Sequence, residues 1–277
     1  MVTELEKIDN SKNRLWIVPN NDLEAKTIIN ILTEQGEQYL ITNQKWGASW
    51  ENLEPGIKEK VEETKKSNDK KIYGIELQGY CEGTENIDHH VYGSDDRSNS
   101  KSSLEQVAEI LRRKLSIDEK FVAANDKGYI PAMEILGRSL NLSESEIKKY
   151  IEKTRKRDRE IQGITDEQER QAEEVIDKIE IKSRNICIHL PHSRTATVQD
   201  RLWGKFDNLL IISDGGEVNF YGTTRMILEL KERFPNSYYG GTLSPVGYGG
   251  YWGTDNVDEK EILAFFEDMV NDMEAER

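Results

Sequence analysis

Cysteine is scarce in this sequence: Cys81 and Cys187 are the only two in 277 residues, and they stand far apart. A disulfide framework or a zinc site built from paired thiolates is therefore excluded, and we interpret both cysteines as small buried residues. Long apolar runs are absent as well, since no segment approaches the roughly 18 consecutive apolar residues of a membrane span. The charged segment 1–14 also lacks the apolar stretch of a signal peptide. We therefore expect a cytoplasmic protein with no membrane partner.

Positive charge is also in short supply. The 52 Asp and Glu residues outnumber the 38 Lys and Arg residues, which gives a formal net charge of -14. A surface this acidic repels a long polyanion, so we do not expect long duplex nucleic acid as a partner. Hydrophobic residues make up 36% of the chain and recur periodically, which indicates a folded protein with a polar surface. The composition favours a small or diffusible substrate.

The first half of the chain alternates short β-type runs with helical patterns, which is typical of α/β proteins. The expected strands are Arg14–Pro19, Tyr39–Thr42 and Lys71–Leu77, and Phe121–Ala124 is a fourth apolar run. We expect this fourth run to lead into a turn that carries Asp126. The pattern predicts a mostly parallel, Rossmann-like sheet with functional side chains at the strand ends.

A long charged segment separates the two halves. Ser143 and Glu146 form a capping box, and the helix that they begin is interrupted at Gly163. The elements expected beyond it are strands at Asn185–Leu190, Leu209–Ile212 and Glu217–Tyr221 and helices at Thr223–Phe234 and around Ile262–Met269. They predict a smaller α/β domain with its own core. We therefore expect one domain at residues 1–163, and a linker helix with the smaller domain at residues 164–277.

Side chains that titrate near neutral pH are concentrated in two places. The four histidines form one pair at His89 and His90 and another at His189 and His192. The carboxylates near expected strand ends and beside the first pair are Asp22, Glu24, Glu76, Asp88 and Asp126. The second pair lies with Arg194 where a strand is expected to meet a helix, a geometry that favours anions.

The string Asp-His-His at residues 88–90 resembles the motif that gives the DHH phosphoesterase superfamily its name. In that family the motif follows an Asp-x-Asp-Ala turn after the first strand and an acidic residue on a later strand. A further Asp comes after the next helix. The corresponding residues of this sequence are Asp22 and Glu24 in the turn, then Glu76, and finally Asp126. The order of the acids is therefore similar to the family as well.

The second half of the chain is similar to the family's smaller domain in a divergent form. That domain binds substrate through a strand, a helix and a glycine-rich turn, to which residues 219–227 and 233–241 correspond. The resemblance thus covers nearly the whole chain. It implies that the active cleft lies between the two domains.

The resemblance implies a phosphoesterase that holds two manganese ions. The implied metal ligands are Asp22, Glu24, Glu76, His89 and Asp126. Glu24, His89 and Asp126 would hold one ion and Asp22 the other, while Glu76 would bridge the two. Carboxylates suit Mn²⁺ or Mg²⁺, and a pair of such ions can clamp the attacking and the leaving oxygen of a displacement at phosphorus.

Catalytic and substrate-binding roles follow in the same way. His90 would contact the scissile phosphate or protonate the leaving group, and Asp88 would orient the histidines from behind. The substrate-binding candidates of the smaller domain are His189, His192, Arg194, Arg225, Gly240 and Gly241. The partner would be a small phosphorylated molecule, such as a nucleotide, a short oligonucleotide or another phosphoester or phosphoanhydride. A homodimer stays open as the assembly.

The sequence departs from the family pattern at the metal ligands. Val18 stands at the position of the family's first histidine, and valine cannot bind a metal ion. Glu24 and Glu76 are each one methylene longer than the expected aspartates. The alternative hypothesis is therefore a degenerate member of the fold that binds a nucleotide or a protein partner without turnover. A third hypothesis is a different hydrolytic or lyase chemistry on the same scaffold.

Structural roles are alternatives for the same acids. Asp22 and Glu24 are also what a helix N-terminus favours, because negative charge there stabilises the helix. Asp126 belongs to the string Asn-Asp-Lys-Gly at residues 125–128, which favours a tight turn. Convergence of these side chains in space distinguishes a metal site from such local roles.

Overall fold

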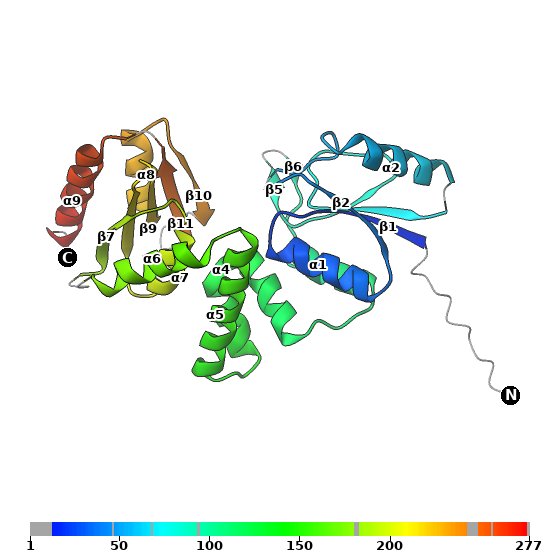
Figure 1. Ribbon diagram of the computed structural model, residues 1–277, viewed down its shortest axis with the longest axis horizontal. Coiled ribbons are helices and arrows are strands. Elements are labelled where there is room, and N and C mark those ends of the chain that lie inside the picture. The colour runs from blue at the N-terminus through cyan, green and yellow to red at the C-terminus, as the bar shows by residue number, and fades with distance from the viewer. Residues whose placement is uncertain are drawn as a thin grey trace. The chain divides into compact units, whose positions relative to one another are not determined.

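The computed structural model describes residues 13–45, 47–67, 69–92, 95–179, 183–242, 249–255 and 257–275. The chain divides into two compact units, Met1–Gln162 and Gly163–Arg277. Each unit combines a β-sheet with helices (Figure 1), which confirms the predicted α/β fold class.

The first unit alternates strands and helices. Its elements are β1 (Arg14–Pro19), α1 (Leu23–Glu34), β2 (Gln38–Thr42), α2 (Pro55–Ser67), β3 (Lys71–Ile75), β4 (Glu85–Ile87), β5 (Val91–Tyr92), β6 (Asp95–Asp96), α3 (Ser103–Ile110), α4 (Ile117–Ser139) and α5 (Glu144–Ile161). Strands β1 to β4 form a sheet in the order β2-β1-β3-β4, in which each adjacent pair is parallel. The chain passes from β1 to β2 on one side and then to β3 on the other. The carboxyl ends of β1 and β3 therefore flank the topological switch point of the sheet.

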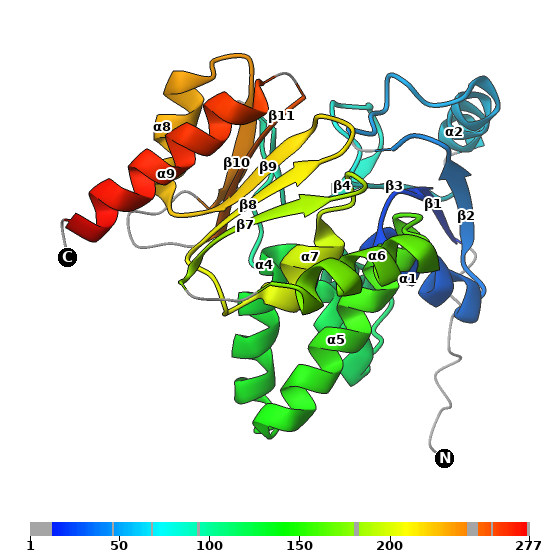
Figure 2. The same cartoon turned by 60° about the vertical axis from the view of Figure 1, so that its left-hand side comes forward.

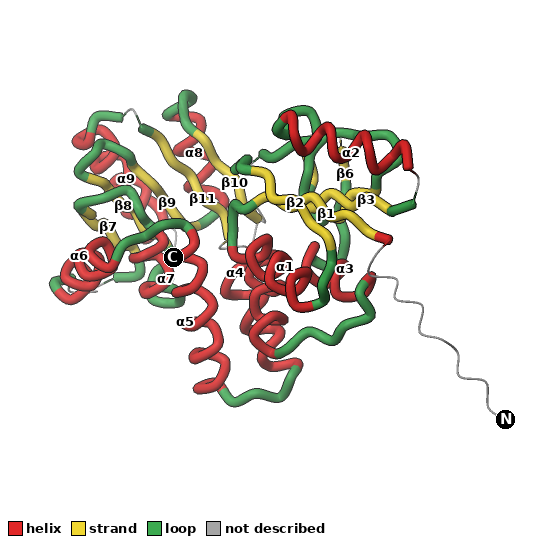
Figure 3. The backbone as a smooth tube through the Cα atoms, turned by 45° about the vertical axis from the view of Figure 1, so that its right-hand side comes forward, coloured by secondary structure: helices red, strands yellow, loops and turns green. Residues whose placement is uncertain are grey.

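Side chains of the central strand alternate between two apolar cores. Trp16 and Val18 of β1 pack in a cluster with residues of α1, α3 and α4, whereas Leu15 and Ile17 pack in another cluster, which includes Val61 of α2. Helices thus cover both faces of the sheet, and Figure 3 shows α2 on one side with α1 and α3 on the other. Burial on both faces explains why these strands are continuous apolar runs in the sequence.

The second unit holds a mixed sheet. Its elements are α6 (Asp166–Asp177), β7 (Asn185–Leu190), α7 (Ala196–Leu202), β8 (Asn208–Ser213), β9 (Val218–Gly222), α8 (Thr224–Arg233), β10 (Tyr238–Thr242), β11 (Gly249–Thr254) and α9 (Glu259–Ala275). The strand order is β10-β11-β9-β8-β7, in which β7 and β8 are parallel and the other pairs are antiparallel. Helices α8 and α9 pack on one face around Phe220 and Trp252 (Figure 2), while α6 and α7 pack around Ile188 and Leu209.

The turn that we expected at Asp126 is wrong. Phe121–Ala124 belongs to helix α4, which begins with a capping box of Ser116 and Glu119, and Asp126 is helical as well. All four residues of the run are buried, because this part of the chain contacts neighbouring helices on several sides. Because all four neighbouring residues are buried, the run shows no alternation of buried and exposed positions and lacked the periodicity that identifies a helix.

Two smaller predictions differ from the structure. Cys187 is exposed and Cys81 is half-buried, so the two cysteines are not the buried residues that we expected. Cys187 lies on the edge strand β7, along which buried and exposed side chains alternate. Strand β3 ends at Ile75, and Glu76 therefore follows the strand instead of lying in it. In the part of the chain that the structure describes, no helix could cross a membrane.

Candidate metal centre

The turn after β1 carries two acidic side chains that α-helices hold in place. Asp22 caps α1, and its Oδ1 accepts a hydrogen bond of 2.8 Å from the Ala25 N–H. Glu24 lies in the first turn of α1, and its Oε1 accepts a hydrogen bond of 3.0 Å from the Leu104 N–H of α3. Helix N-termini thus hold one oxygen of each carboxylate. The capping role explains that one oxygen, and it leaves the second for another contact.

Glu76, directly after β3, has a backbone conformation that glutamate rarely adopts. Its φ is 49°, and left-handed backbone costs a residue with a Cβ roughly 1–2 kcal/mol. Its N–H donates a hydrogen bond of 2.9 Å to the Ile87 carbonyl, which holds the turn in place. The side chain is buried. A strained backbone under a buried acid at the switch point suggests a role for its carboxylate.

Asp88 organises the two histidines that follow it. Its Oδ1 accepts hydrogen bonds from the backbone N–H groups of His89, at 2.8 Å, and His90, at 3.1 Å, and lies 2.9 Å from His90 Nδ1. Burial alone would raise the pKa of Asp88, but these hydrogen bonds outweigh it and hold the pKa below its usual value. The hydrogen bond to Asp88 in turn raises the pKa of His90. Asp88 thus holds the backbone of both histidines and the ring of His90.

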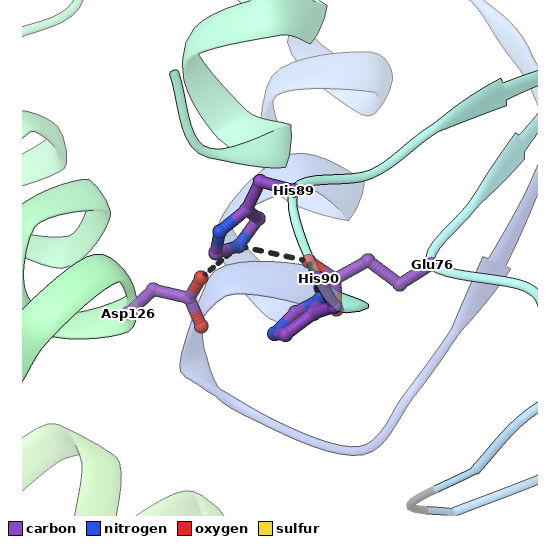
Figure 4. Close-up of side chains that lie close together, drawn as sticks. All are labelled: Glu76, His89, His90 and Asp126. Carbon is purple, nitrogen blue, oxygen red and sulfur yellow. Dashed lines mark ion pairs between the residues drawn. The ribbon is translucent and has the colours of Figure 1, made fainter. Parts of the chain in front are cut away.

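Carboxylates from three segments converge on the His89 ring. Its Nε2 lies 2.6 Å from Asp126 Oδ2, 3.5 Å from Glu76 Oε1 and 3.9 Å from Glu24 Oε2. Figure 4 shows Asp126 and Glu76 approaching this ring from opposite sides, with His90 beside it. Glu76, His89, His90 and Asp126 each offer a ligand atom within 4.8 Å of the others. The structure therefore adds His90 to the residues that could bind a metal.

Buried polar atoms of this site lack the hydrogen bonds that such atoms normally form. Among the described residues of the site, Asp22 Oδ2, Glu24 Oε2 and Glu76 Oε1 accept no hydrogen bond. His89 Nε2 and Asp126 Oδ2 form an ion pair with each other at 2.6 Å. All these atoms belong to the five residues that the sequence predicts as metal ligands, which we name the ligand cluster. Carboxylate oxygens with imidazole nitrogen form a donor set that divalent cations accept. Glu76, His89, His90 and Asp126 could thus hold a metal ion.

The electrostatics of the ligand cluster also favour a cation. Burial, reinforced by the charge of Glu76, raises the pKa of Asp22 to about 7. Burial and the charges of Asp126 and Glu76 raise the pKa of Glu24 well above its usual value. Burial alone would lower the pKa of His89, but the carboxylates of Asp126 and Glu76 outweigh it and raise that pKa to about 10. Protons on Asp22, Glu24 and His89 therefore offset part of the negative charge of the cluster in the metal-free protein, and a bound cation would replace them.

Two residues near the histidines escaped sequence reasoning. Tyr92 Oη lies 3.4 Å from Asp88 Oδ1, and the Tyr92 ring is 5.9 Å from the His90 ring. Arg97 donates hydrogen bonds of 2.7 Å to the Leu77 and Gly79 carbonyls and approaches Asp88 Oδ2 at 3.3 Å. Both residues come from a polar segment without a motif. A basic residue in an otherwise acidic neighbourhood was the one signal that could have indicated Arg97.

Val18 occupies an entirely apolar position. It is fully buried in the cluster that includes Trp16 and Leu23. Valine offers no ligand for a second ion. The structure therefore contains no replacement at this position for the histidine of the DHH pattern. Asp22 therefore lacks the neighbouring histidine ligand that the resemblance to the DHH family implies.

The substrate-binding candidates of the second unit do not form one group. His189 lies on β7 and Gly240 on β10, which are the two edge strands of the five-stranded sheet. Four strand spacings, roughly 19 Å, separate these two strands. Both ring nitrogens of His192 are engaged within this unit, with Nδ1 3.1 Å from the Arg194 N–H donor and Nε2 2.9 Å from the Gln168 carbonyl. His192 thus has a structural role.

The remaining candidates of this unit are dispersed. Arg225 of α8 donates a hydrogen bond of 2.9 Å to Glu229 Oε1, and Arg194 is exposed. Gly240 faces Tyr251 across the sheet, and a Cβ at Gly240 would lie 2.8 Å from the Tyr251 hydroxyl. Gly241 adopts a φ of 81°, which glycine tolerates. Packing thus accounts for Gly240, and substrate binding by this set stays a prediction.

Comparison with known proteins gives no family. No family model and no curated protein matches the sequence. An uncharacterized protein from Helicobacter pylori G27, known from a crystal structure, is similar over 94% of this chain and 99% of its own, with 12% sequence identity and a TM-score of 0.22. Similarity at this level shows neither a shared fold nor a shared function.

Proposed function

We propose that the protein is a metal-dependent, phosphoesterase-like hydrolase. Its substrate would be a small nucleotide, a short oligonucleotide or another phosphoester or phosphoanhydride. The observation that supports the proposal is the convergence of buried carboxylate oxygens on His89 Nε2, of which Glu24 Oε2 and Glu76 Oε1 accept no hydrogen bond. They meet at the switch point of a parallel sheet, where α/β proteins commonly bind ligands.

The ligand cluster would hold the ion. Glu76, His89 and Asp126 offer ligand atoms within 4.8 Å of one another, and Glu24 Oε2 lies 3.9 Å from His89 Nε2. A divalent cation bound there supplies Lewis-acid activation of a phosphoryl oxygen. The Leu104 N–H fixes one oxygen of Glu24, so the other keeps its direction toward His89 without reorganisation.

His90 and Asp88 would handle the proton of the reaction. The pKa of His90 is raised by its hydrogen bond to Asp88, which favours the protonated ring near neutral pH. Because Nδ1 is engaged by Asp88, Nε2 is the atom from which His90 would donate a proton to the leaving oxygen. The His90 side chain is 36% exposed against 8% for His89, so His90 is the histidine that a substrate can reach.

A second candidate function is binding without turnover. The apolar burial of Val18 favours it, because that position supplies no ligand for a second ion. A protein of this kind would bind a nucleotide or a protein partner through the same fold. Robust turnover would contradict it.

The test is a metal-dependent hydrolysis assay. Metal-stripped protein would be supplied with Mn²⁺ or Mg²⁺ and offered dinucleotides, cyclic dinucleotides, pyrophosphate and a generic phosphodiester. We expect Mn²⁺-dependent product release with at least one of them, which Asp126→Asn and His89→Ala abolish. The matched control is Asp118→Asn, on the same helix as Asp126, where Asp118 forms an exposed ion pair with Lys153. Absence of turnover on the whole panel, or full activity of Asp126→Asn, would contradict the proposal.

A further inference from the structure

Helix α4 is broken immediately after the metal-ligand candidate Asp126. Gly128 has φ -175° and ψ 29°, and Tyr129 has φ 58° and ψ -147°, so neither residue is helical. Pro131 explains the break, because a proline ring clashes with the carbonyl four residues earlier in a helix. Positive φ is rare for tyrosine and persists only where the surroundings hold it. Asp126 therefore lies in the last turn before a strained break, and regular helix geometry alone does not fix its carboxylate.

Arg155 of α5 contacts the chain on both sides of Asp126. Its Nη1 donates a hydrogen bond of 2.9 Å to Asn125 Oδ1, one residue before Asp126. Its guanidinium also lies 4.6 Å from the centroid of the Tyr129 ring, three residues after Asp126. A planar guanidinium can donate and stack at once, which a lysine ammonium cannot do in the same way. One side chain thus links both flanks of the ligand.

Arg155 is itself held in place. It is 7% exposed, and its Nη1 donates a hydrogen bond of 2.6 Å to Asp158 Oδ2, one turn further along α5. Asp158 is 6% exposed, and its Oδ2 also accepts a hydrogen bond of 3.0 Å from Gln162 Nε2. A buried, charge-assisted network of this kind fixes rotamers more firmly than an exposed ion pair.

We propose that Arg155 is a positioning residue for the metal centre. By holding Asn125 and Tyr129, it places the Asp126 carboxylate beside His89 Nε2. The assignment rests on the proposed function, since it requires that the ligand cluster binds a metal. Residues that orient a metal ligand commonly change metal affinity by 10–100-fold when they are replaced.

The test compares Mn²⁺ affinity with fold stability. The variants are Arg155→Met, which removes the guanidinium, Arg155→Lys, which keeps the charge, and Asn125→Ala, which removes one contact. The matched control is Arg113→Met, because Arg113 also pairs with an acid of α4, Glu119, but at the other end of that helix. The dissociation constant for Mn²⁺ would be measured by calorimetry on metal-stripped, full-length protein, and the unfolding midpoint by circular dichroism.

We expect Arg155→Met to weaken Mn²⁺ binding by roughly 10–100-fold and Asn125→Ala to weaken it less. Arg155→Lys should restore binding only in part, and Arg113→Met should lower the unfolding midpoint without changing the affinity. If Arg155→Met and Asn125→Ala both bind Mn²⁺ with wild-type affinity, or if Arg113→Met loses as much affinity as Arg155→Met, the positioning role of Arg155 is overturned. The proposed function is not affected by either result. If Arg155→Met does not fold, Asn125→Ala decides in the same way. A wild type that binds no Mn²⁺ overturns the proposed function, and the assignment with it.

Discussion

Buried carboxylates should make the metal-free protein less stable as the pH rises. The pKa of Asp22 is raised from 3.8 to about 7 in the folded state, so the folded protein binds more protons than the unfolded chain between these values. Its contribution to stability is therefore fully present below pH 3.8 and is lost as the pH rises through about 7. The difference corresponds to roughly 4 kcal/mol, taken as an order of magnitude.

Asp22→Asn isolates this effect. Asparagine caps helices as well as aspartate does, so its Oδ1 can accept the hydrogen bond from the Ala25 N–H. The metal-free variant should be more stable than the wild type at about pH 8, by up to roughly 4 kcal/mol, and similar to it at about pH 4. The raised pKa of His89 also makes the folded protein less stable as the pH rises, between pH 6.5 and about 10. The lowered pKa of Asp88 changes stability only below pH 3.8, which is outside the range of about pH 4 to 8 that is compared.

Urea denaturation in the presence of a chelator, across about pH 4 to 8, measures the effect. Asp118→Asn serves as the control, because it also removes one carboxylate but from an exposed ion pair. Its profile should run parallel to that of the wild type. A wild-type stability that rises between about pH 5 and 7, or an Asp22→Asn profile with the wild-type slope, would refute the reasoning.

Further outcomes follow from single positions. Glu76→Asn should stabilise the metal-free protein by about 1 kcal/mol in thermal denaturation, since asparagine tolerates a positive φ, and a lower midpoint would count against the strain at this position. Gly74→Ala should destabilise the protein by about 1–3 kcal/mol in urea, because the added Cβ would lie 2.2 Å from Trp50 Cζ2; an unchanged midpoint would show that the tryptophan is not held there. Mn²⁺ at about 100 times its dissociation constant should stabilise the wild type by about 2.7 kcal/mol. An equal gain in His89→Ala would disprove the ligand role of His89.

The sequence alone was sufficient to predict the parallel sheet and the acids around it. Apolar runs buried on both faces mark β1 and β3, and parallel strands bring their carboxyl ends to one edge. Asp22, Glu24 and Glu76 follow those strands, so their convergence needs little tertiary information. Asp126 lies in the group that could hold a metal ion, but it belongs to a helix and not to the expected turn, because the four buried residues before it show no helical periodicity.

Features that depend on packing between helices were beyond sequence reasoning. Arg155 lies 30 residues from Asn125 in the chain, and in the sequence it is one more charge of the long charged segment between the two halves. Its burial arises only when α5 packs against α4. The dispersion of His189 and Gly240 likewise follows from a strand order that hydrophobic patterns do not encode. Side chains at strand ends are predictable, whereas the contacts that position them are not.

The central claim is that the ligand cluster binds a divalent cation. Calorimetric titration of metal-stripped protein with Mn²⁺, run beside His89→Gln, tests it most directly. We expect saturable binding by the wild type, and binding at least roughly 100-fold weaker in the variant, since losing a ligand costs at least as much as losing its support. No binding by the wild type, or equal binding by His89→Gln, would show that the ligand cluster is not a metal site.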